Sequence, residues 1–265
     1  MDSLVKLGLL ISVLFFLQQT SSQLVVNVKN RGGDVVIETI QANTSNDVVQ
    51  LQFQNTDGTI VHQLIDYKSE AQIFRAHVLW EEEQGFSQYK PQVLCFVTRF
   101  NKNEFISADA MSKLRQKNPT AIRQPEEERP PELHTMDTQV YLDRGGLISP
   151  HLTATCSDTV DSIYTKESDI RLWARAPGRD GLMSTVQRLY PTKYQHCHQV
   201  EDATKPCLCT YSLTVGWYPC GLKYCRGKDS TGKYVSYRCG IKTCKRHLSF
   251  DYVSKQKMYC MWDET

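Results

Sequence analysis

The sequence predicts an α+β domain followed by a small disulfide-rich domain. Short apolar segments separated by Gly- and Asn-containing turns run through the first hundred residues, a pattern typical of antiparallel strands. Two segments with helix-start signals follow them. Eight of the ten cysteines then lie between Cys197 and Cys260. We therefore expect a signal peptide over residues 1–22, an α+β domain over residues 23–185 and a cysteine-rich domain over residues 193–265.

The amino terminus has the pattern of a secretory signal peptide. Lys6 precedes an apolar run over residues 7–17, and residues 20–22 supply the small side chains that a signal peptidase recognises. The run is too short to span a bilayer, which takes about 20 apolar residues. We expect cleavage before Gln23 and a secreted, extracellular protein with no transmembrane segment.

Six strands are predicted in the amino-terminal part. The first two flank a turn with Gly32 and Gly33, where glycine permits a positive φ. Residues 93–100 give the strongest strand prediction, because they are apolar and rich in β-branched and aromatic side chains. The six segments are residues 24–28, 35–40, 48–53, 59–67, 73–80 (which also fits a short helix) and 93–100.

A first helix is predicted over residues 108–117. Ser107 can cap its start, and Asn118-Pro119 ends it. The segment 124–131 is rich in Pro and Glu, which favours a mobile loop with solvated carboxylates.

A second helix is predicted from Ser149-Pro150, where a capping residue precedes a proline in the first turn. A weak strand at residues 138–142 comes before it. The helical stripe consists of Leu152, Cys156, Val160 and Ile163. The apolar pattern continues over residues 170–173 and is broken at residues 176–181, so we place the domain boundary between there and Lys193.

The ten cysteines are expected to form five disulfides, because secretion exposes them to an oxidising compartment. Cys95 and Cys156 are the only cysteines before residue 197, so we expect them to pair. Such a bond closes a loop of about 60 residues and contributes about 4 kcal/mol in the chain-entropy model. The remaining eight are Cys197, Cys207, Cys209, Cys220, Cys225, Cys239, Cys244 and Cys260.

Four of these eight belong to a sequence repeat. Residues 218–226 and 237–245 both read Tyr-x-Cys-Gly-aliphatic-Lys-x-Cys-basic, so we expect the two units to pair in equivalent ways. Eight cysteines allow many connectivities, and the sequence does not choose among them. Zinc is the alternative, with His196, His198 or His247 as further ligands, but the secretory route favours disulfides. We therefore predict neither a metal nor a cofactor.

Charge gives a weak indication of partners. The chain has 31 Lys and Arg against 29 Asp and Glu, which does not suggest binding to nucleic acid. From Cys197 onward, however, 11 basic side chains face 6 acidic ones. This excess fits a solvated face or a weak contact with acidic glycans or lipid head groups. Asn43-Thr44-Ser45 is a glycosylation sequon, so we predict a glycan on Asn43.

No catalytic motif is found. The sequence contains no Gly-x-Ser-x-Gly, no His-Glu-x-x-His and no Gly-rich phosphate loop. The acidic runs at 81–83 and 126–128 do not resemble the separated carboxylate pair that acid–base catalysis needs. We therefore predict that the protein is not an enzyme.

Several motifs carry a family resemblance. They are Cys95-Phe96-Val97-Thr98, Ala110-Met111-Ser112-Lys113-Leu114-Arg115-Gln116-Lys117-Asn118-Pro119, Leu147-Ile148-Ser149-Pro150-His151-Leu152, Val160-Asp161-Ser162-Ile163-Tyr164-Thr165, Trp217-Tyr218-Pro219-Cys220, Leu222-Lys223-Tyr224-Cys225 and Met261-Trp262-Asp263-Glu264. Over nearly all of the mature chain, the sequence resembles the Out at first proteins, a family of secreted animal proteins.

The resemblance also implies a fold. The amino-terminal part of this family is described as similar to BRICHOS domains, which have a central sheet flanked by two helices, one disulfide and a characteristic Asp. It implies that Cys95 and Cys156 form that disulfide and that Asp66 is the Asp, although strands before about Val48 exceed a minimal module. An inward-facing Asp66 would make the domain sensitive to pH, because burial disfavours a charged carboxylate. Asp66→Asn would then be more stable than wild type at pH 7. The alternative is an exposed aspartate at a strand end.

Two functions are expected. The first is a secreted, non-enzymatic binding protein for an extracellular protein or peptide. Its BRICHOS-like domain would act by strand addition or as a chaperone, and its cysteine-rich domain as a scaffold for the partner. The alternative is a developmental signalling ligand that acts through the cysteine-rich domain.

Overall fold

The computed structural model describes residues 22–29, 32–55, 58–78, 92–116, 118–159, 163–260 and 262. Apart from Ser22, the predicted signal peptide lies outside these residues.

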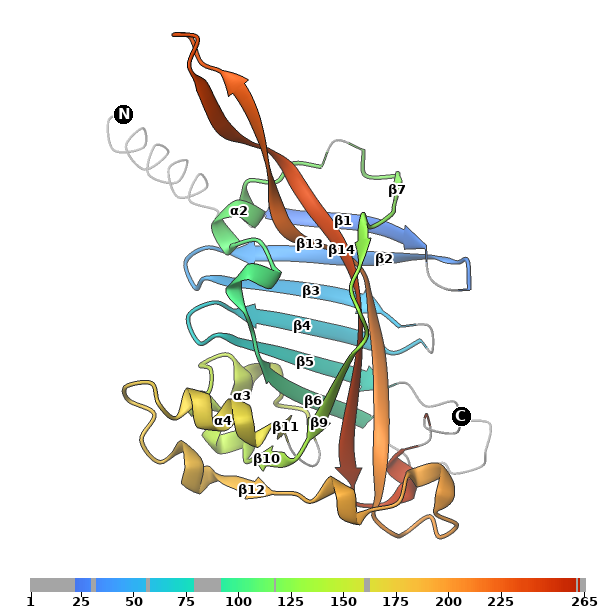
Figure 1. Cartoon of the computed structure of the whole chain (residues 1–265). Coiled ribbons are helices and arrows are strands. Elements are labelled where there is room, and N and C mark those ends of the chain that lie inside the picture. The colour runs from blue at the N-terminus through green and yellow to red at the C-terminus, as the bar shows by residue number, and fades with distance from the viewer. Residues whose placement is uncertain are drawn as a thin grey trace, which may run out of the picture.

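An antiparallel meander of six strands forms the centre of the molecule (Figure 1). Its side chains alternate between two faces, as the period of two requires. In the third strand, for example, Leu51 and Phe53 are buried while Gln52 is exposed. All six predicted strands are present. Of the predicted segment 73–80, residues 73–78 belong to a strand, not to a helix, and residues 79–80 lie outside the described residues. The strands are β1 (Ser22–Lys29), β2 (Val35–Asn43), β3 (Val48–Gln54), β4 (Ile60–Asp66), β5 (Ala71–Val78) and β6 (Gln92–Arg99).

Short strands extend the meander at both ends into a ten-stranded mixed sheet. On one side, β11 (Ile163–Thr165) pairs parallel to β6, followed by β10 (Thr138–Val140) and β12 (Val186–Arg188). On the other side, β7 (Ile122–Arg123) pairs parallel to β1. The edge strands of the described sheet are therefore β12 and β7, with three and two residues.

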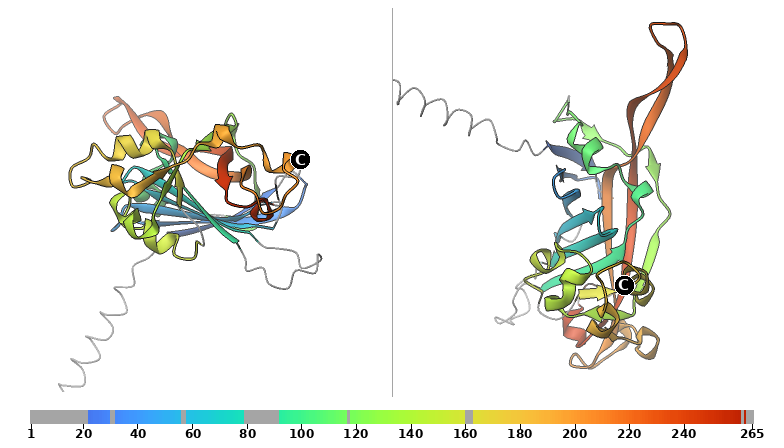
Figure 2. Two further views of the ribbon diagram at one scale, coloured as in Figure 1. Left: turned by 90° about the horizontal axis from the view of Figure 1, so that it is seen from below. Right: turned by 90° about the vertical axis from the view of Figure 1, so that its left-hand side faces the viewer.

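A long hairpin crosses one face of this sheet (Figures 1 and 2). Its strands, β13 (Cys207–Lys228) and β14 (Tyr234–Ser254), have 22 and 21 residues. Two further strands, β8 (Glu127–Glu128) and β9 (Glu132–Met136), run parallel to β14. The prediction of a mobile loop at residues 124–131 is wrong at β8, because the backbone there bonds to Thr243 and Lys245.

The main core lies between the sheet and the hairpin. The Phe96 ring of β6 stacks on the Phe250 ring of β14 with centroids 4.5 Å apart, and Tyr211 and Tyr252 pack around them. All four rings are buried. The hydrophobic core therefore runs without interruption from the sheet into the segment predicted as residues 193–265.

A second, smaller core covers the opposite face of the sheet. Here Ile73 and Val97 pack against Leu152, Ile170 and other apolar side chains of the helical segments. The helices are α2 (Ala108–Ser112), α3 (Leu152–Thr155) and α4 (Glu167–Trp173). Six 3₁₀ turns of the described residues accompany them: η2 (Lys102–Glu104), η3 (Leu142–Leu147), η4 (Leu182–Thr185), η5 (Pro191–Lys193), η6 (Cys197–Gln199) and η7 (Lys257–Tyr259).

The predicted α+β, BRICHOS-like class is therefore wrong. The protein is mostly β, and its described helices are single turns or two turns long. The first helix begins after Ser107 as predicted, but it ends at Ser112 and does not reach residue 117.

The second helix also stops early. Of the predicted stripe, Leu152 lies in α3, which ends at Thr155, and Ile163 belongs to strand β11, whereas Val160 lies outside the described residues. The hydroxyls of Thr155 and Thr159 bond to nearby backbone carbonyls at 2.8 and 2.7 Å. Such side chains compete with the helical backbone and disfavour its continuation.

Candidate functional site

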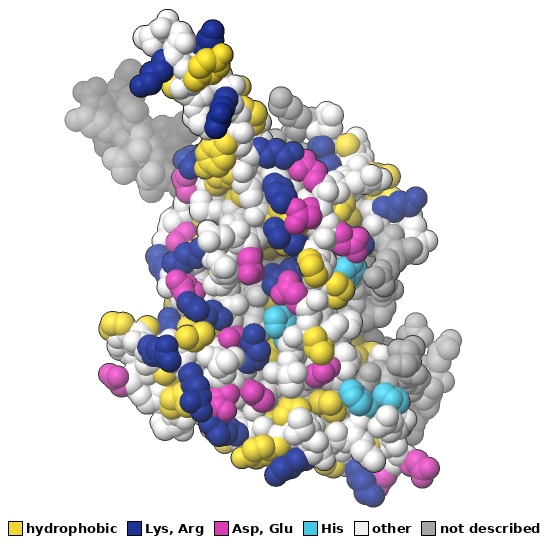
Figure 3. Space-filling view, viewed as in Figure 1, with side chains coloured by type: hydrophobic (Ala, Val, Ile, Leu, Met, Phe, Trp, Pro, Cys, Tyr) yellow, Lys and Arg dark blue, Asp and Glu magenta, His cyan; other side chains and the backbone are white. Residues whose placement is uncertain are grey.

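The far end of the β13–β14 hairpin leaves the sheet and projects away from it (Figure 1). We call residues 223–240 the arm and the remaining described residues the body. In Figure 3 the arm carries yellow and dark blue side chains. Its exposed apolar and aromatic side chains are Tyr224 (62% exposed), Tyr234 (70%), Val235 (39%) and Tyr237 (52%). These exposed side chains make the projecting arm a candidate interaction surface.

Two disulfides tie the strands of the hairpin together. Cys220 pairs with Cys244 at its base and Cys225 with Cys239 in the arm, each with Cα atoms 5.7 Å apart. The first cysteine of one repeat unit thus bonds to the second cysteine of the other unit. Two copies of one motif on antiparallel strands are related by a local two-fold axis, which produces this reciprocal pairing. The arm is therefore covalently closed where it leaves the body.

A compact turn ends the arm. The carboxylate of Asp229 accepts hydrogen bonds from the backbone N–H groups of Thr231 and Lys233 and from the Thr231 hydroxyl, at 2.9, 3.0 and 2.7 Å. Gly232 has a φ of 82°, which suits the left-handed position of such a loop. These hydrogen bonds, above all the one from the Thr231 hydroxyl, lower the pKa of Asp229. The single acidic side chain of the arm is thus engaged in its turn.

The strand register divides the arm into two faces, because directly opposed residues point to the same side. Arg226 and Lys228 follow each other on one strand of the first face, which we call the cationic face. The Lys228 ammonium lies 5.3 Å from the centre of the Tyr234 ring. The members of this face are Tyr224, Arg226, Lys228, Tyr234, Ser236 and Arg238.

The opposite face holds the arm together. It carries the Cys225–Cys239 disulfide and the side chain of Tyr237. That ring lies over Gly227, where an added Cβ would come within 3.0 Å of it. The disulfide and this ring contact stabilise the arm from one side and leave the cationic face open.

Acidic side chains neutralise the lysines at the root of the hairpin, the part next to the arm that contains Lys223, Lys242 and Lys245. The run of residues 126–128, predicted to be solvated, lies beside β14 and forms ion pairs along it. Lys223, where the arm begins, lies 2.5 Å from a Glu126 carboxylate oxygen. The other pairs are Glu127 with Lys242, and Glu128 with Lys245 and His247. In contrast, none of the ion pairs of the described residues includes Arg226, Lys228 or Arg238.

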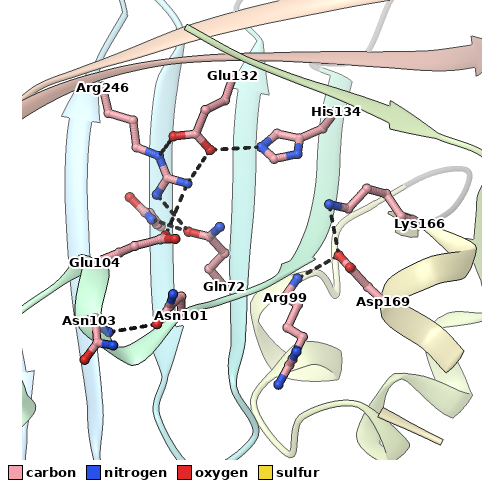
Figure 4. Close-up of polar contacts among 11 residues, drawn as sticks. Gln72, Arg99, Asn101, Asn103, Glu104, Glu132, His134, Lys166, Asp169 and Arg246 are labelled. Carbon is pink, nitrogen blue, oxygen red and sulfur yellow. Dashed lines mark hydrogen bonds and ion pairs between the residues drawn. The ribbon is translucent and has the colours of Figure 1, made fainter. Parts of the chain in front are cut away.

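A partly buried ion pair fastens the base of the hairpin to its neighbours (Figure 4). The Arg246 guanidinium of β14 is 8% exposed and makes two hydrogen bonds to the Glu132 carboxylate of β9, at 2.7 and 2.8 Å. It also contacts Gln72 at 3.3 Å and Glu104 at 3.7 Å. Burial by itself raises the pKa of Glu132, but His134 and Arg246 outweigh it and lower that pKa to about 2.

A buried carboxylate holds a β-bulge. The pairing of β13 with β14 shifts between Val215 and Tyr218, which frees the N–H groups of Gly216 and Trp217. Both donate to the Glu38 carboxylate of β2, at 2.8 and 3.1 Å. A Cβ on Gly216 would lie 2.9 Å from that carboxylate, so only glycine allows this approach.

Burial raises the pKa of Glu38 to about 7, although the two backbone hydrogen bonds oppose the change. Sequence reasoning missed this residue. The period of two did contain the signal, because Glu38 lies on the same face of β2 as Ile40 and Ala42.

A polar cavity of about 310 Å³ lies on the opposite face of the sheet. Gln50, Gln52 and His62 line it, together with Arg75 and Asp158. Arg75 is already paired with Asp158 at 2.7 Å, so the cavity offers no free charge from this pair. The arm is therefore the stronger candidate for a site.

The structure also places the two polar residues singled out from the sequence. Asn43 is exposed at the end of β2, so the sequon is accessible, and glycosylation stays a prediction. Asp66 is buried, and it accepts hydrogen bonds from the N–H groups of Lys68 and Ser69, both 3.0 Å, and from the Ser149 hydroxyl at 2.7 Å. It connects β4 to the segment before α3.

Three further disulfides lie in the body. Cys95 is bonded to Cys156, the expected pair, and links β6 to the end of α3. The other two are Cys197–Cys207 and Cys209–Cys260. All the cysteines of the described residues are thus paired, and no bond joins Cys95 or Cys156 to the segment beyond residue 196.

These features define a disulfide-bonded, mostly β protein that presents a closed hairpin from a rigid base. The comparisons with known proteins agree with the resemblance seen in the sequence. The family model "Out at first" matches residues 22–173, and "Out at first, C-terminal" matches residues 196–264. The chain therefore belongs to the Out at first family.

Two curated relatives are similar over most of this chain. The Out at first protein of Drosophila virilis is 46% identical over 256 residues, which are 92% of this chain and 83% of the relative. That of Drosophila melanogaster is 46% identical over 255 residues. The match covers 92% of this chain but only 52% of the Drosophila melanogaster protein, so the chain spans about half the length of this relative. No solved structure matches the chain. In the part of the chain that the structure describes, no helix has the length and apolar character to cross a membrane.

Proposed function

We propose that this protein is a secreted, non-enzymatic binding protein and that the arm contacts its extracellular partner. One observation carries the proposal: tyrosine and basic side chains gather, exposed, on a projecting element closed by a disulfide. Tyr and Arg are the side chains that most often dominate binding interfaces. A pre-ordered hairpin also loses little conformational entropy on binding.

The large sheet is a weaker candidate for the binding surface. Strand addition requires a long, free edge, and the described edge strands have only two and three residues. One face is covered by the hairpin and part of the other by the helical segments. We therefore assign binding to the arm and assign support of the arm to the body.

Secretion and the lack of enzymatic activity are parts of this proposal. Five disulfides are typical of an oxidising compartment, and the predicted signal peptide gives a route to it. The proposal also agrees with the lack of catalytic motifs in the sequence.

A second candidate function is a developmental signalling ligand. The arm lies in the region matched by the "Out at first, C-terminal" model, where this alternative locates the activity. Both functions use the same surface and differ in the consequence of binding. A transcriptional response of cells to added wild-type protein, lost when exposed tyrosines of the arm are replaced, would favour the signalling role.

The test replaces exposed tyrosines of the arm. The full-length Tyr224→Ser/Tyr234→Ser variant is compared with wild type for binding to cells of the tissue that produces the protein. We expect binding to weaken by about tenfold, a typical effect of losing interface aromatics. The matched control is Tyr141→Ser/Tyr190→Ser, which removes two exposed tyrosines of the body, 59% and 53% exposed. Equal binding by the two double variants would show that the arm is not the contact.

A further inference from the structure

The cationic face of the arm differs from the other basic parts of the hairpin because its side chains form none of the ion pairs of the described residues. Lys223, Lys242 and Lys245 at the root are paired with the glutamates of residues 126–128. Arg226 and Arg238 have no acidic partner in the part of the chain that the structure describes. The arm has five basic side chains and one acidic, and the acidic one is bonded within the turn. The face therefore complements a ligand with several negative charges.

The spacing of these charges favours an extended ligand. Side chains at positions i and i+2 of a strand lie about 7 Å apart on one face, which describes Arg226 and Lys228. Arg238 adds a third cation from the neighbouring strand. Two of the three are arginines, whose planar guanidinium donates paired hydrogen bonds to oxyanions. A chain with an anionic group on successive units fits this row better than a single small anion.

The aromatic residues favour a ligand whose anionic groups are carried by a chain of sugar rings. Tyr224 and Tyr234 lie on the same face as the cations, and each is directly opposite a basic side chain of the neighbouring strand. An exposed Tyr ring packs against the C–H face of a pyranose, and its hydroxyl bonds to ring substituents. Both rings are more than half exposed, which leaves them accessible to such a ligand.

We infer that the cationic face binds a sulfated polysaccharide chain, an inference that rests on the proposed role of the arm as the binding element. The disulfides place the protein where sulfated sugars, not nucleic acids, are the abundant polyanions. A bilayer surface fits less well. Val235 and the ring of Tyr237 are on the opposite face, so the cations have no large aliphatic neighbours on their own face to insert between lipids.

The experiment measures binding of the full-length protein to immobilised heparin. Arg226→Ser/Lys228→Ser/Arg238→Ser is expected to bind at least about tenfold more weakly than wild type. Its dependence on salt should also fall by about two to three in log–log slope, because fewer counterions are released. The matched control, Arg175→Ser/Lys193→Ser/Lys205→Ser, removes the same charge from exposed positions of the body and should stay within about twofold of wild type. Equal losses in the two triple variants would overturn the inference.

Two further probes identify the ligand class. The protein should bind desulfated heparin much more weakly than heparin. Equal binding to both would contradict recognition of sulfate groups by the cationic face. The protein should bind phosphatidylserine vesicles no better than neutral vesicles. Binding to phosphatidylserine vesicles without binding to heparin would show that the ligand is an anionic membrane surface and not a glycan. If wild type fails to bind heparin while the Tyr224→Ser/Tyr234→Ser variant still loses its cell binding, only the glycan inference fails. If cell binding never depends on the arm, the proposed function fails by itself.

Discussion

The base and the arm of the β13–β14 hairpin are made by the same two strands but have opposite surroundings. At the base, Phe250 is buried in the core and Arg246 is paired with Glu132. In the arm, aromatic rings are exposed, and the cations of the cationic face take part in none of the ion pairs of the described residues. Buried, paired side chains at the base stabilise the fold, whereas the exposed side chains of the cationic face are available to a partner.

The sequence repeat crosses the junction between these two regions. Its first unit begins in the core with Tyr218, 4% exposed, and ends in the arm. The second begins in the arm with Tyr237, 52% exposed, and ends in the core. The same motif therefore has two roles, and position along the hairpin decides which residues stabilise and which remain available.

The largest expected effect is at the ion pair of Glu132 with the buried Arg246. Glu132→Gln leaves the Arg246 charge buried, so we expect the free energy of unfolding at pH 7 to fall by about 3 kcal/mol in denaturant titrations. The double variant Glu132→Leu/Arg246→Met, which removes both charges, should lie closer to wild type. A loss of less than about 1 kcal/mol for Glu132→Gln would show that the pair does not fasten the base.

The pH dependence of this pair has a definite sign. The folded pKa of Glu132, about 2, is below its ordinary value of 4.5. The stability that the pair contributes is therefore present above pH 4.5 and is lost as the pH falls towards 2.

Glu38 should act in a different pH range and with the opposite sign. Its folded pKa of about 7 is above 4.5, so the native state keeps the proton longer than the unfolded chain. Stability should fall by about 3 kcal/mol as the pH rises from 4.5 to 7, and should level off above that. Glu38→Gln should abolish this fall in denaturant unfolding at several pH values. The exposed control Glu201→Gln should keep it. A wild-type profile that is flat from pH 5 to 8 would contradict the assignment.

Asp66 gives an intermediate effect within the body. Its carboxylate accepts three hydrogen bonds, and an amide in its place presents an NH₂ group to some of these donors. We expect Asp66→Asn to lower the free energy of unfolding by about 1–2 kcal/mol at pH 7. This is the reverse of the effect expected from a BRICHOS-type aspartate. The exposed Asp143→Asn serves as control. A more stable Asp66→Asn variant would restore the switch hypothesis.

The smallest effect on the body is expected from the disulfide of the arm. Cys225→Ser/Cys239→Ser should change the global unfolding free energy by less than about 1 kcal/mol, because the arm can open without the core. Amide hydrogen exchange in the arm should nevertheless become faster. A loss of about 3 kcal/mol, the chain-entropy value for a loop of this size, would instead show that arm and body unfold together.

The sequence predicts the meander well for a physical reason. Strands such as β3 alternate in polarity, and β6 is a short continuous apolar run, so local pattern and final burial agree. The pairing of Cys95 with Cys156 needed only the count of cysteines before residue 197.

The hairpin and its support could not be predicted in the same way. Residues 126–128 look like a solvated acidic run, and they become ordered only because lysines distant in sequence lie beside them. The second helix was overextended because apolar spacing does not show that local Thr hydroxyls compete for the backbone. The reciprocal disulfides were available in principle, since an antiparallel repeat predicts them, but only once the repeat is known to form a hairpin.

The central claim, that the base supports and the arm binds, is tested most directly by shortening the hairpin. Leu222 and Ile241 are opposite each other, so residues 223–240 can be replaced by Asn-Gly, which closes a two-residue turn. Cell binding and denaturant unfolding are then measured on the same full-length preparation. We predict an unfolding free energy within about 1 kcal/mol of wild type and binding reduced at least about tenfold. Retained binding, or a loss of several kcal/mol in stability, would contradict the account.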